Sequence, residues 1–252
     1  MPHTSHLKPI LYREYMRKPT LQIVWRTDAG RVPSGHVAIV SDVLRASTTI
    51  AAAFSRGVNQ LQATTEIAVA RALASEHDAL LMGERQNVII DGFDYGNSPV
   101  AIGPELAGQC VIFTSTNFPH ALQAASDANV VFIGAPVNCT AVCGQALAKA
   151  RQLETDITIM LAGEPSEAHA GEDAFFGALA VTFLSDDCDV SEEARVLYRS
   201  IDVFRTDLAI AGSVHAQELI AAGFGRDVEF AFDVDRLDTV PVWDGVWISV
   251  RQ

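Results

Sequence analysis

The chain has 252 residues, of which 49% are hydrophobic, and a formal net charge of −13. That length suits one large domain or two small ones. No apolar run approaches the roughly 20 residues that a membrane-spanning helix needs, and the N-terminal residues contain no signal-peptide core. A field of uniform negative sign repels nucleic acid and anionic membranes. We therefore expect a cytoplasmic protein that binds neither nucleic acid nor a membrane.

The predicted elements follow one pattern, in which an apolar, β-branched run ends in a polar cluster and an alanine-rich segment with helical spacing follows. This pattern occupies residues 36–57, 110–128, 130–153 and 157–184. Continuous apolar strands that alternate with helices are typical of a mostly parallel sheet covered on both faces. No linker rich in Pro or Ser divides the chain, so we expect one domain.

The polar clusters that end the predicted strands form the main candidate site. They are Ser41-Asp42, Gly83-Glu84-Arg85, Thr114 to Asn117, Asn138 and Gly163-Glu164. In open α/β sheets ligands bind beyond the carboxyl ends of the strands, so we expect these clusters along one edge. Each of them could instead cap a helix, but the presence of several acids beside two arginines favours a binding site for the set.

Acidic residues in these clusters suit a hard divalent cation. Mg²⁺ takes oxygen ligands and usually one or two carboxylates, with water and substrate phosphate completing its shell. Asp42 is the sharpest candidate, because it ends an apolar strand where an unpaired acid is costly. Its alternative role is to cap the following helix. The other acidic candidates are Glu84, Asp94, Glu172 and Asp173.

Arg45 and Arg85 could each hold a phosphate, carboxylate or sulfonate through two parallel hydrogen bonds. The alternative is a structural ion pair, for instance with Glu84 or Asp42. Motifs for nucleotide binding and for a nucleophilic serine are absent. The four cysteines have no metal-site spacing, so we expect buried free thiols. Among the histidines we place only His120 near a site, and a surface position is the simpler reading.

Several motifs occur in a fixed order: SDVLRASTTIAAAF, GER, GFDYGNSP, TSTNFPHAL, NCTAV, GEDAFFGAL and HAQELIAAGFGRDVEFAFDVDRLDTVPV. Over about residues 39–242 this series resembles the ComB family of 2-phosphosulfolactate phosphatases. The resemblance implies a three-layer α/β/α sandwich and a Mg²⁺-dependent phosphatase. The family reaction converts 2-phospho-3-sulfolactate to 3-sulfolactate and phosphate, a step toward coenzyme M.

The resemblance also implies roles for individual residues. The catalytic set is Asp42, Glu84, Asp94 and Asn117. The set that binds the small anionic substrate is Arg45, Thr48, Arg85, Asn97, Ser98 and Asn138. The Mg²⁺ ligands are Asp42, Glu84, Glu172 and Asp173. Asp42 could attack phosphorus or hold the metal, and Leu44 stands where the haloacid-dehalogenase pattern needs a second Asp, which favours the metal role.

The chain departs from the family pattern at two places beside the expected pocket. Gln86-Asn87 follows GER where the family usually has two glycines, and Phe118 replaces a glycine that lets backbone approach a ligand closely. These changes support a second hypothesis, a non-catalytic or substrate-altered member that binds an anionic metabolite. Residues 1–20 have no clear counterpart and form an extension of unknown role before a single domain at 21–252. Nothing in the sequence excludes a homo-oligomer.

Overall fold

The structure is a computed structural model of the chain, and it describes residues 17–28, 30–163 and 171–250. Eleven strands of these residues form one sheet in the order β5-β4-β6-β3-β11-β10-β7-β2-β8-β1-β9. The strands are β1 (Thr20–Trp25), β2 (Val37–Ser41), β3 (Gln60–Thr64), β4 (Leu80–Arg85), β5 (Val88–Ile89), β6 (Cys110–Thr114), β7 (Val130–Ile133), β8 (Ile157–Leu161), β9 (Asp189–Val190), β10 (Val242–Trp243) and β11 (Ile248–Ser249).

The sheet consists of two parallel sets of strands. One set contains β9, β1, β8, β2 and β7, and the other contains β3, β6 and β4. The short strands β10 and β11 join the sets through three successive antiparallel pairings, so the two sets run in opposite directions across this junction. The predicted mostly parallel sheet is confirmed, although the sequence patterns did not indicate the antiparallel junction.

Helices cover both faces of the sheet. They are α2 (Ala46–Ser55), α3 (Ile67–His77), α4 (Phe118–Ala124), α5 (Cys139–Leu153), α6 (Gly171–Leu184), α7 (Glu192–Ser200), α8 (Thr206–Gly212), α9 (Val214–Ala221) and α10 (Gly225–Ala231). Short 3-10 turns lie at η1 (Arg26–Asp28), η2 (Pro99–Ala101), η3 (Pro104–Leu106) and η4 (Pro136–Asn138). None of the helices in the described ranges has both the length and the apolar character needed to cross a bilayer.

The two sides of the central strands enter two separate cores. Ile39 of β2 and Ile159 of β8 pack in one core, which includes residues of α5 and α6. The alternate residues Val40 and Met160 pack in the other, which includes residues of α2 and α4. Because β2 and β8 are covered on both sides, all of their residues are buried. Their sequences therefore do not alternate between apolar and polar side chains. The three-layer α/β/α sandwich is therefore confirmed.

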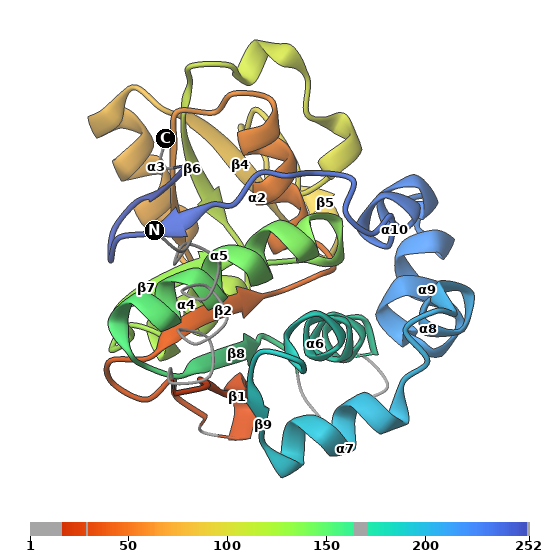
Figure 1. Cartoon of the computed structure of the whole chain (residues 1–252). Helices are drawn as coiled ribbons and strands as arrows, with labels where there is room; N and C mark the ends of the chain where they lie inside the picture. Colours follow the sequence, from red (N-terminus) through yellow and green to blue (C-terminus); the bar gives the residue numbers. More distant parts are fainter. Residues whose placement is uncertain (1–16, 29, 164–170, 251–252) are drawn as a thin grey trace, which may run out of the picture.

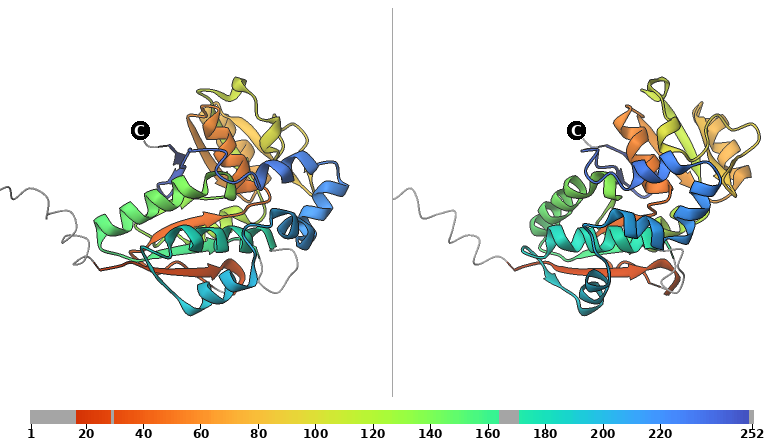
Figure 2. Two further views of the ribbon diagram at one scale, coloured as in Figure 1. Left: turned by 45° about the vertical axis from the view of Figure 1, so that its right-hand side comes forward. Right: turned by 90° about the vertical axis from the view of Figure 1, so that its right-hand side faces the viewer.

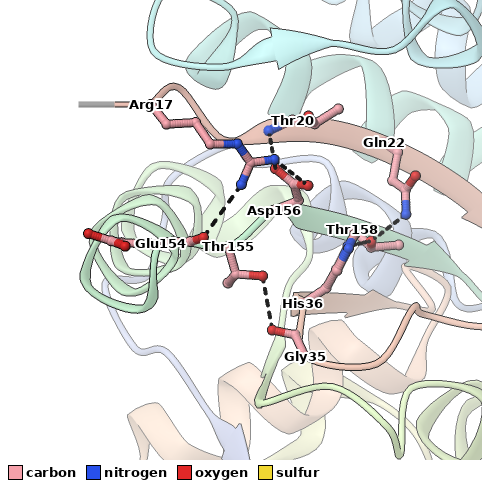
Figure 3. Close-up of polar contacts among 9 residues, drawn as sticks. All are labelled: Arg17, Thr20, Gln22, Gly35, His36, Glu154, Thr155, Asp156 and Thr158. Carbon is pink, nitrogen blue, oxygen red and sulfur yellow. Dashed lines mark hydrogen bonds and ion pairs between the residues drawn. The ribbon is translucent and has the colours of Figure 1, made fainter. Parts of the chain in front are cut away.

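The C-terminal helices link the two parts of the molecule. In Figures 1 and 2, α8, α9 and α10, drawn in blue, run along one side from α7 toward α2 and the β4–β5 hairpin. At the opposite end of the strands, Figure 3 shows Arg17 and Thr20 bound to Asp156, which precedes β8. Strand β1 thus begins at Thr20, within the predicted extension. Residues 1–16 of that extension lie outside the described ranges.

Candidate active site

The loop between β2 and α2 places Asp42 at the carboxyl end of a fully buried strand. The side chain of Asp42 is almost fully buried, and burial raises its pKa to about 6. The Ala46 N–H lies 3.4 Å from Asp42 Oδ1, which is long for a hydrogen bond. The hydroxyl of Ser47 binds the Asp42 backbone N–H at 2.9 Å instead. Helix capping therefore compensates little of the cost of burying this carboxylate.

Two further carboxylates lie beside Asp42, at the start of α6. Asp173 accepts hydrogen bonds from the backbone N–H groups of Val43 at 2.8 Å and Gly163 at 2.9 Å, so it joins the ends of β2 and β8. Burial raises the pKa of Asp173 well above its ordinary value, and the charges of Asp42 and Glu172 raise it further. Burial also raises the pKa of Glu172. We call Asp42, Glu172 and Asp173 the carboxylate cluster.

The carboxylate cluster fits the predicted magnesium ion in part. Buried carboxylates whose charges repel one another are stabilised by a cation, and oxygen donors are what Mg²⁺ requires. Among the described residues, no group of three or more His, Cys, Asp or Glu side chains is arranged to hold a metal ion by itself. The cluster therefore suits an ion held by one or two carboxylates, and the Mg²⁺ requirement stays a prediction.

Arg45 lies at the other side of this loop in a buried network. Its Nη1 donates to Asp227 Oδ2 at 2.9 Å, and both side chains are at most 3% exposed. Its Nη2 donates to Asn87 Oδ1 at 3.0 Å, and its Cζ lies 4.3 Å from the centre of the Phe224 ring. Ser98 donates to the second oxygen of Asp227 at 2.7 Å. Arg45 does form an ion pair, but with Asp227 and not with Asp42 or Glu84.

The β4–β5 hairpin brings Glu84 to the same region. The charge of Glu84 contributes to the raised pKa of Asp42, after the larger effect of burial. The Glu84 carboxylate accepts the Asn87 N–H. Gln86 and Asn87 have φ angles of 54° and 63°, the left-handed backbone that two-residue hairpin turns require and that glycine adopts most easily. The turn keeps this conformation without the family's glycines.

Arg85 holds backbone and hydroxyl groups of the neighbouring strands. Its Nη1 donates to the Glu84 carbonyl at 2.7 Å, and its Nη2 donates to the Thr65 carbonyl and to Thr114 Oγ1. The predicted ion-pair alternative for Arg85 is not what the structure shows. Its predicted hold on the substrate stays a prediction, and the observed contacts tie the ends of β3, β4 and β6 together.

Thr48, Asn97 and Asn138 are buried. Thr48 donates to the Val43 carbonyl at 2.7 Å. Asn138 binds three backbone groups, because it accepts the Ala135 N–H and donates to two carbonyls. By contrast, Asn97 Oδ1 has no hydrogen-bond partner within the described residues. Thr48 and Asn138 therefore shape the loops, and only Asn97 has an unused buried acceptor.

Two predicted catalytic residues are exposed, unlike the members of the carboxylate cluster. The exposed Asp94 accepts the Leu81 N–H at 2.8 Å, about 10 Å along β4 from Glu84 by strand geometry. Asn117 is exposed at the start of α4, where Arg26 reaches its Oδ1 at 3.4 Å. Their catalytic roles stay predictions. Glu164, at the end of β8, lies outside the described residues.

Phe118 is buried and His120 is exposed, although both closely follow Asn117. Phe118, the first residue of α4, is fully buried in the hydrophobic core, so its side chain does not project into a pocket. A surface position for His120 is confirmed. The histidine near the carboxylate cluster is His215, whose Nε2 lies 3.1 Å from the Leu44 carbonyl. Its charge acts to lower the pKa values of Asp42 and Glu172 against the larger effect of burial.

Sequence reasoning missed His215, Asp227 and Asn87 as parts of this region. His215 and Asp227 belong to the long C-terminal motif, which was the available signal, but their partners Leu44 and Arg45 are far away in sequence. Asn87 was noted only as a departure from glycine. The contact from its side chain to Arg45 depends on the fold of the hairpin over the β2–α2 loop.

A family model described as 2-phosphosulpholactate phosphatase matches residues 25–245. Several relatives are called probable 2-phosphosulfolactate phosphatase. The one in Carboxydothermus hydrogenoformans is 34% identical over 206 residues, which cover 81% of this chain and 84% of that protein. One in Symbiobacterium thermophilum is 32% identical over 219 residues, with 83% and 92% covered. One in Deinococcus radiodurans is 34% identical over 222 residues, with 83% and 90% covered. The chain belongs to the 2-phosphosulpholactate phosphatase family.

Proposed function

We propose that the protein is a phosphatase that hydrolyses the phosphate ester of 2-phosphosulfolactate to 3-sulfolactate and phosphate. Family membership supports this proposal, and the relatives carry that name. The structural observation that carries it is the carboxylate cluster at the carboxyl ends of β2 and β8, beside the buried guanidinium of Arg45. Action in the cytoplasm, on a route to coenzyme M, is part of the same proposal.

We further propose that the enzyme needs Mg²⁺. Asp42 is the first ligand that we assign, with Asp173 or Glu172 as the second and Glu84 nearby across the hairpin. A magnesium ion there would neutralise charge on the phosphoryl group. The raised pKa values support this assignment, because burial of these carboxylates favours either a proton or a cation beside each of them.

The chain's own residues have separate tasks in this proposal. Arg45 and the N-terminal turn of α2 provide positive potential for the anionic substrate. Asp227, Ser98 and Phe224 fix the Arg45 guanidinium, so it needs little reorganisation as charge shifts to the phosphoryl oxygens. Asp173 holds the ends of β2 and β8 together and thereby sets the position of Asp42.

A phosphate-release assay tests the activity. Purified protein is given 2-phosphosulfolactate and a panel of other phosphorylated 2-hydroxy acids, first with Mg²⁺ and then with excess chelator. We expect turnover of 2-phosphosulfolactate that stops in chelator and returns with Mg²⁺. Full turnover in chelator would remove the metal requirement. Tight binding without phosphate release would instead support the alternative, a binding protein for an anionic metabolite.

A further inference from the structure

Asn87 occupies a backbone position that most side chains avoid. Its φ is 63°, and a residue other than glycine with positive φ is uncommon, with Asn among the better tolerated types. Its N–H is held by the Glu84 carboxylate. Its side chain turns toward Arg45, whose Nη2 donates to Asn87 Oδ1 at 3.0 Å. Asn87 therefore connects two predicted site residues from different loops.

The chemistry of Arg45 determines which way the Asn87 amide faces. A guanidinium has only N–H donors, so the amide must present its oxygen to Arg45 and direct its NH₂ group elsewhere. Within the described residues, Asn87 Nδ2 has no hydrogen-bond acceptor. Asn87 is half-buried. Its Nδ2 is not one of the fully buried side-chain atoms that lack a hydrogen-bond partner. Among the described residues, two oriented N–H donors beside Arg45 therefore have no acceptor.

We propose that Asn87 is a substrate-binding residue whose Nδ2 donates a hydrogen bond to an anionic oxygen of the substrate. This inference rests on the proposed function, because a phosphorylated sulfolactate supplies phosphate, carboxylate and sulfonate oxygens. Arg45 orients the amide through Asn87 Oδ1, and the Glu84 carboxylate holds the backbone of the turn. An amide donor of this kind adds no charge, so it can lie between Arg45 and Glu84 without repelling either charged group.

Two variants separate this role from a structural one. Asn87→Asp keeps an oxygen for Arg45 but replaces the NH₂ donors with a carboxylate oxygen that repels an anion. We expect its KM for 2-phosphosulfolactate to rise by about a hundredfold. Asn87→Gly keeps the turn, since glycine adopts positive φ readily, and loses only the amide. We expect its KM to rise by roughly tenfold, the effect of one hydrogen bond to a charged group.

Gln86→Gly is the matched control, because Gln86 is the other turn residue with positive φ and its side chain makes no hydrogen bond within the described residues. We expect its KM to equal that of the wild type. A KM within twofold of wild type in folded Asn87→Asp would overturn the proposal, since that variant keeps the contact to Arg45. If Asn87→Asp does not fold, an unchanged KM in Asn87→Gly would overturn it equally.

Product inhibition identifies the group that Asn87 binds. Weaker inhibition of Asn87→Gly by inorganic phosphate would assign the phosphoryl oxygens, and weaker inhibition by 3-sulfolactate would assign the carboxylate or sulfonate. Calorimetric titration with 2-phosphosulfolactate keeps this proposal separate from the activity. If the wild type binds it without turnover, the hydrolytic function fails, while the ratio of variant to wild-type Kd still decides the role of Asn87. If the wild type does not bind it, both proposals fail.

Discussion

The central strands have buried or partly buried carboxylates at both ends, and their surroundings differ. At the amino end of β8, Asp156 accepts two hydrogen bonds from the Arg17 guanidinium, at 2.8 and 2.9 Å, and one from the Thr20 N–H (Figure 3). At the carboxyl ends, none of the three members of the carboxylate cluster forms an ion pair with a Lys or Arg among the described residues.

The pKa values record this difference. Burial acts to raise the pKa at both ends, but at Asp156 the Thr20 N–H and Arg17 outweigh it, and the pKa lies below its ordinary value. At Asp42 burial prevails and the pKa rises to about 6. The chain itself thus supplies a cation for the carboxylate at one end of the strands. At the other end no Lys or Arg of the described residues pairs with the cluster, and burial favours a proton or a bound cation there. Such local inconsistency is expected at functional sites.

Asp42→Asn should have the largest effect. Asn caps helices about as well as Asp, and it removes the charge that burial penalises, so the melting temperature should not fall. We expect the rate of phosphate release to drop by at least about a hundredfold, because transition-state stabilisation is lost. Asp156→Asn, the matched change at the other end of the strands, should keep the wild-type rate. Near-normal turnover by Asp42→Asn would exclude a catalytic or metal-binding role.

Asp227→Ala tests the buried ion pair between Asp227 and Arg45. Arg45 would remain buried without its counter-ion, which typically costs about 3–5 kcal/mol in the free energy of unfolding. Urea denaturation measures this loss. Ser98→Ala removes only the hydroxyl that binds Asp227 and should cost about 1 kcal/mol. Equal stability of the two variants would show that the ion pair contributes nothing beyond the hydroxyl.

Arg85→Lys should have a smaller effect, and on stability alone. The substitution keeps the charge but loses the fork that reaches Glu84, Thr65 and Thr114 at once. We expect a loss of roughly 1–2 kcal/mol in the free energy of unfolding, with KM and kcat close to wild type. A rise in KM at unchanged stability would show instead that Arg85 binds the substrate.

Asp156→Asn should have the smallest effect, since Arg17 is largely exposed and such ion pairs contribute at most about 1 kcal/mol. Because the folded pKa of Asp156 is lowered, its contribution is present above the unfolded pKa of about 3.9 and is lost as the pH falls below it, through the folded pKa. Melting temperatures of wild type and variant should therefore differ at pH 7 and converge in acid. A constant difference across this range would contradict the assignment.

Much of the fold was predictable because local sequence decides it. The strands β2 and β8 are short apolar runs, and polar residues follow them. Asp42 could therefore be placed at the end of β2, and the cost of burying an unpaired acid there indicated a site. The two-residue strands β10 and β11 are too short to show any periodicity. The pairing of Arg45 with Asp227 could not be predicted either, since nothing in the sequence near Arg45 indicates its partner.

The junction made by β10 and β11 has a consequence for how the molecule assembles. Ile248 pairs with Leu61 and Val242 pairs with Phe132, so the strands that connect the two parallel sets are the last of the described strands to be synthesised. Such contacts between distant parts of a chain form slowly, because long loops must close first. Each set can form its own pairings on the nascent chain. We therefore expect the complete sheet to form only after these last strands have been made.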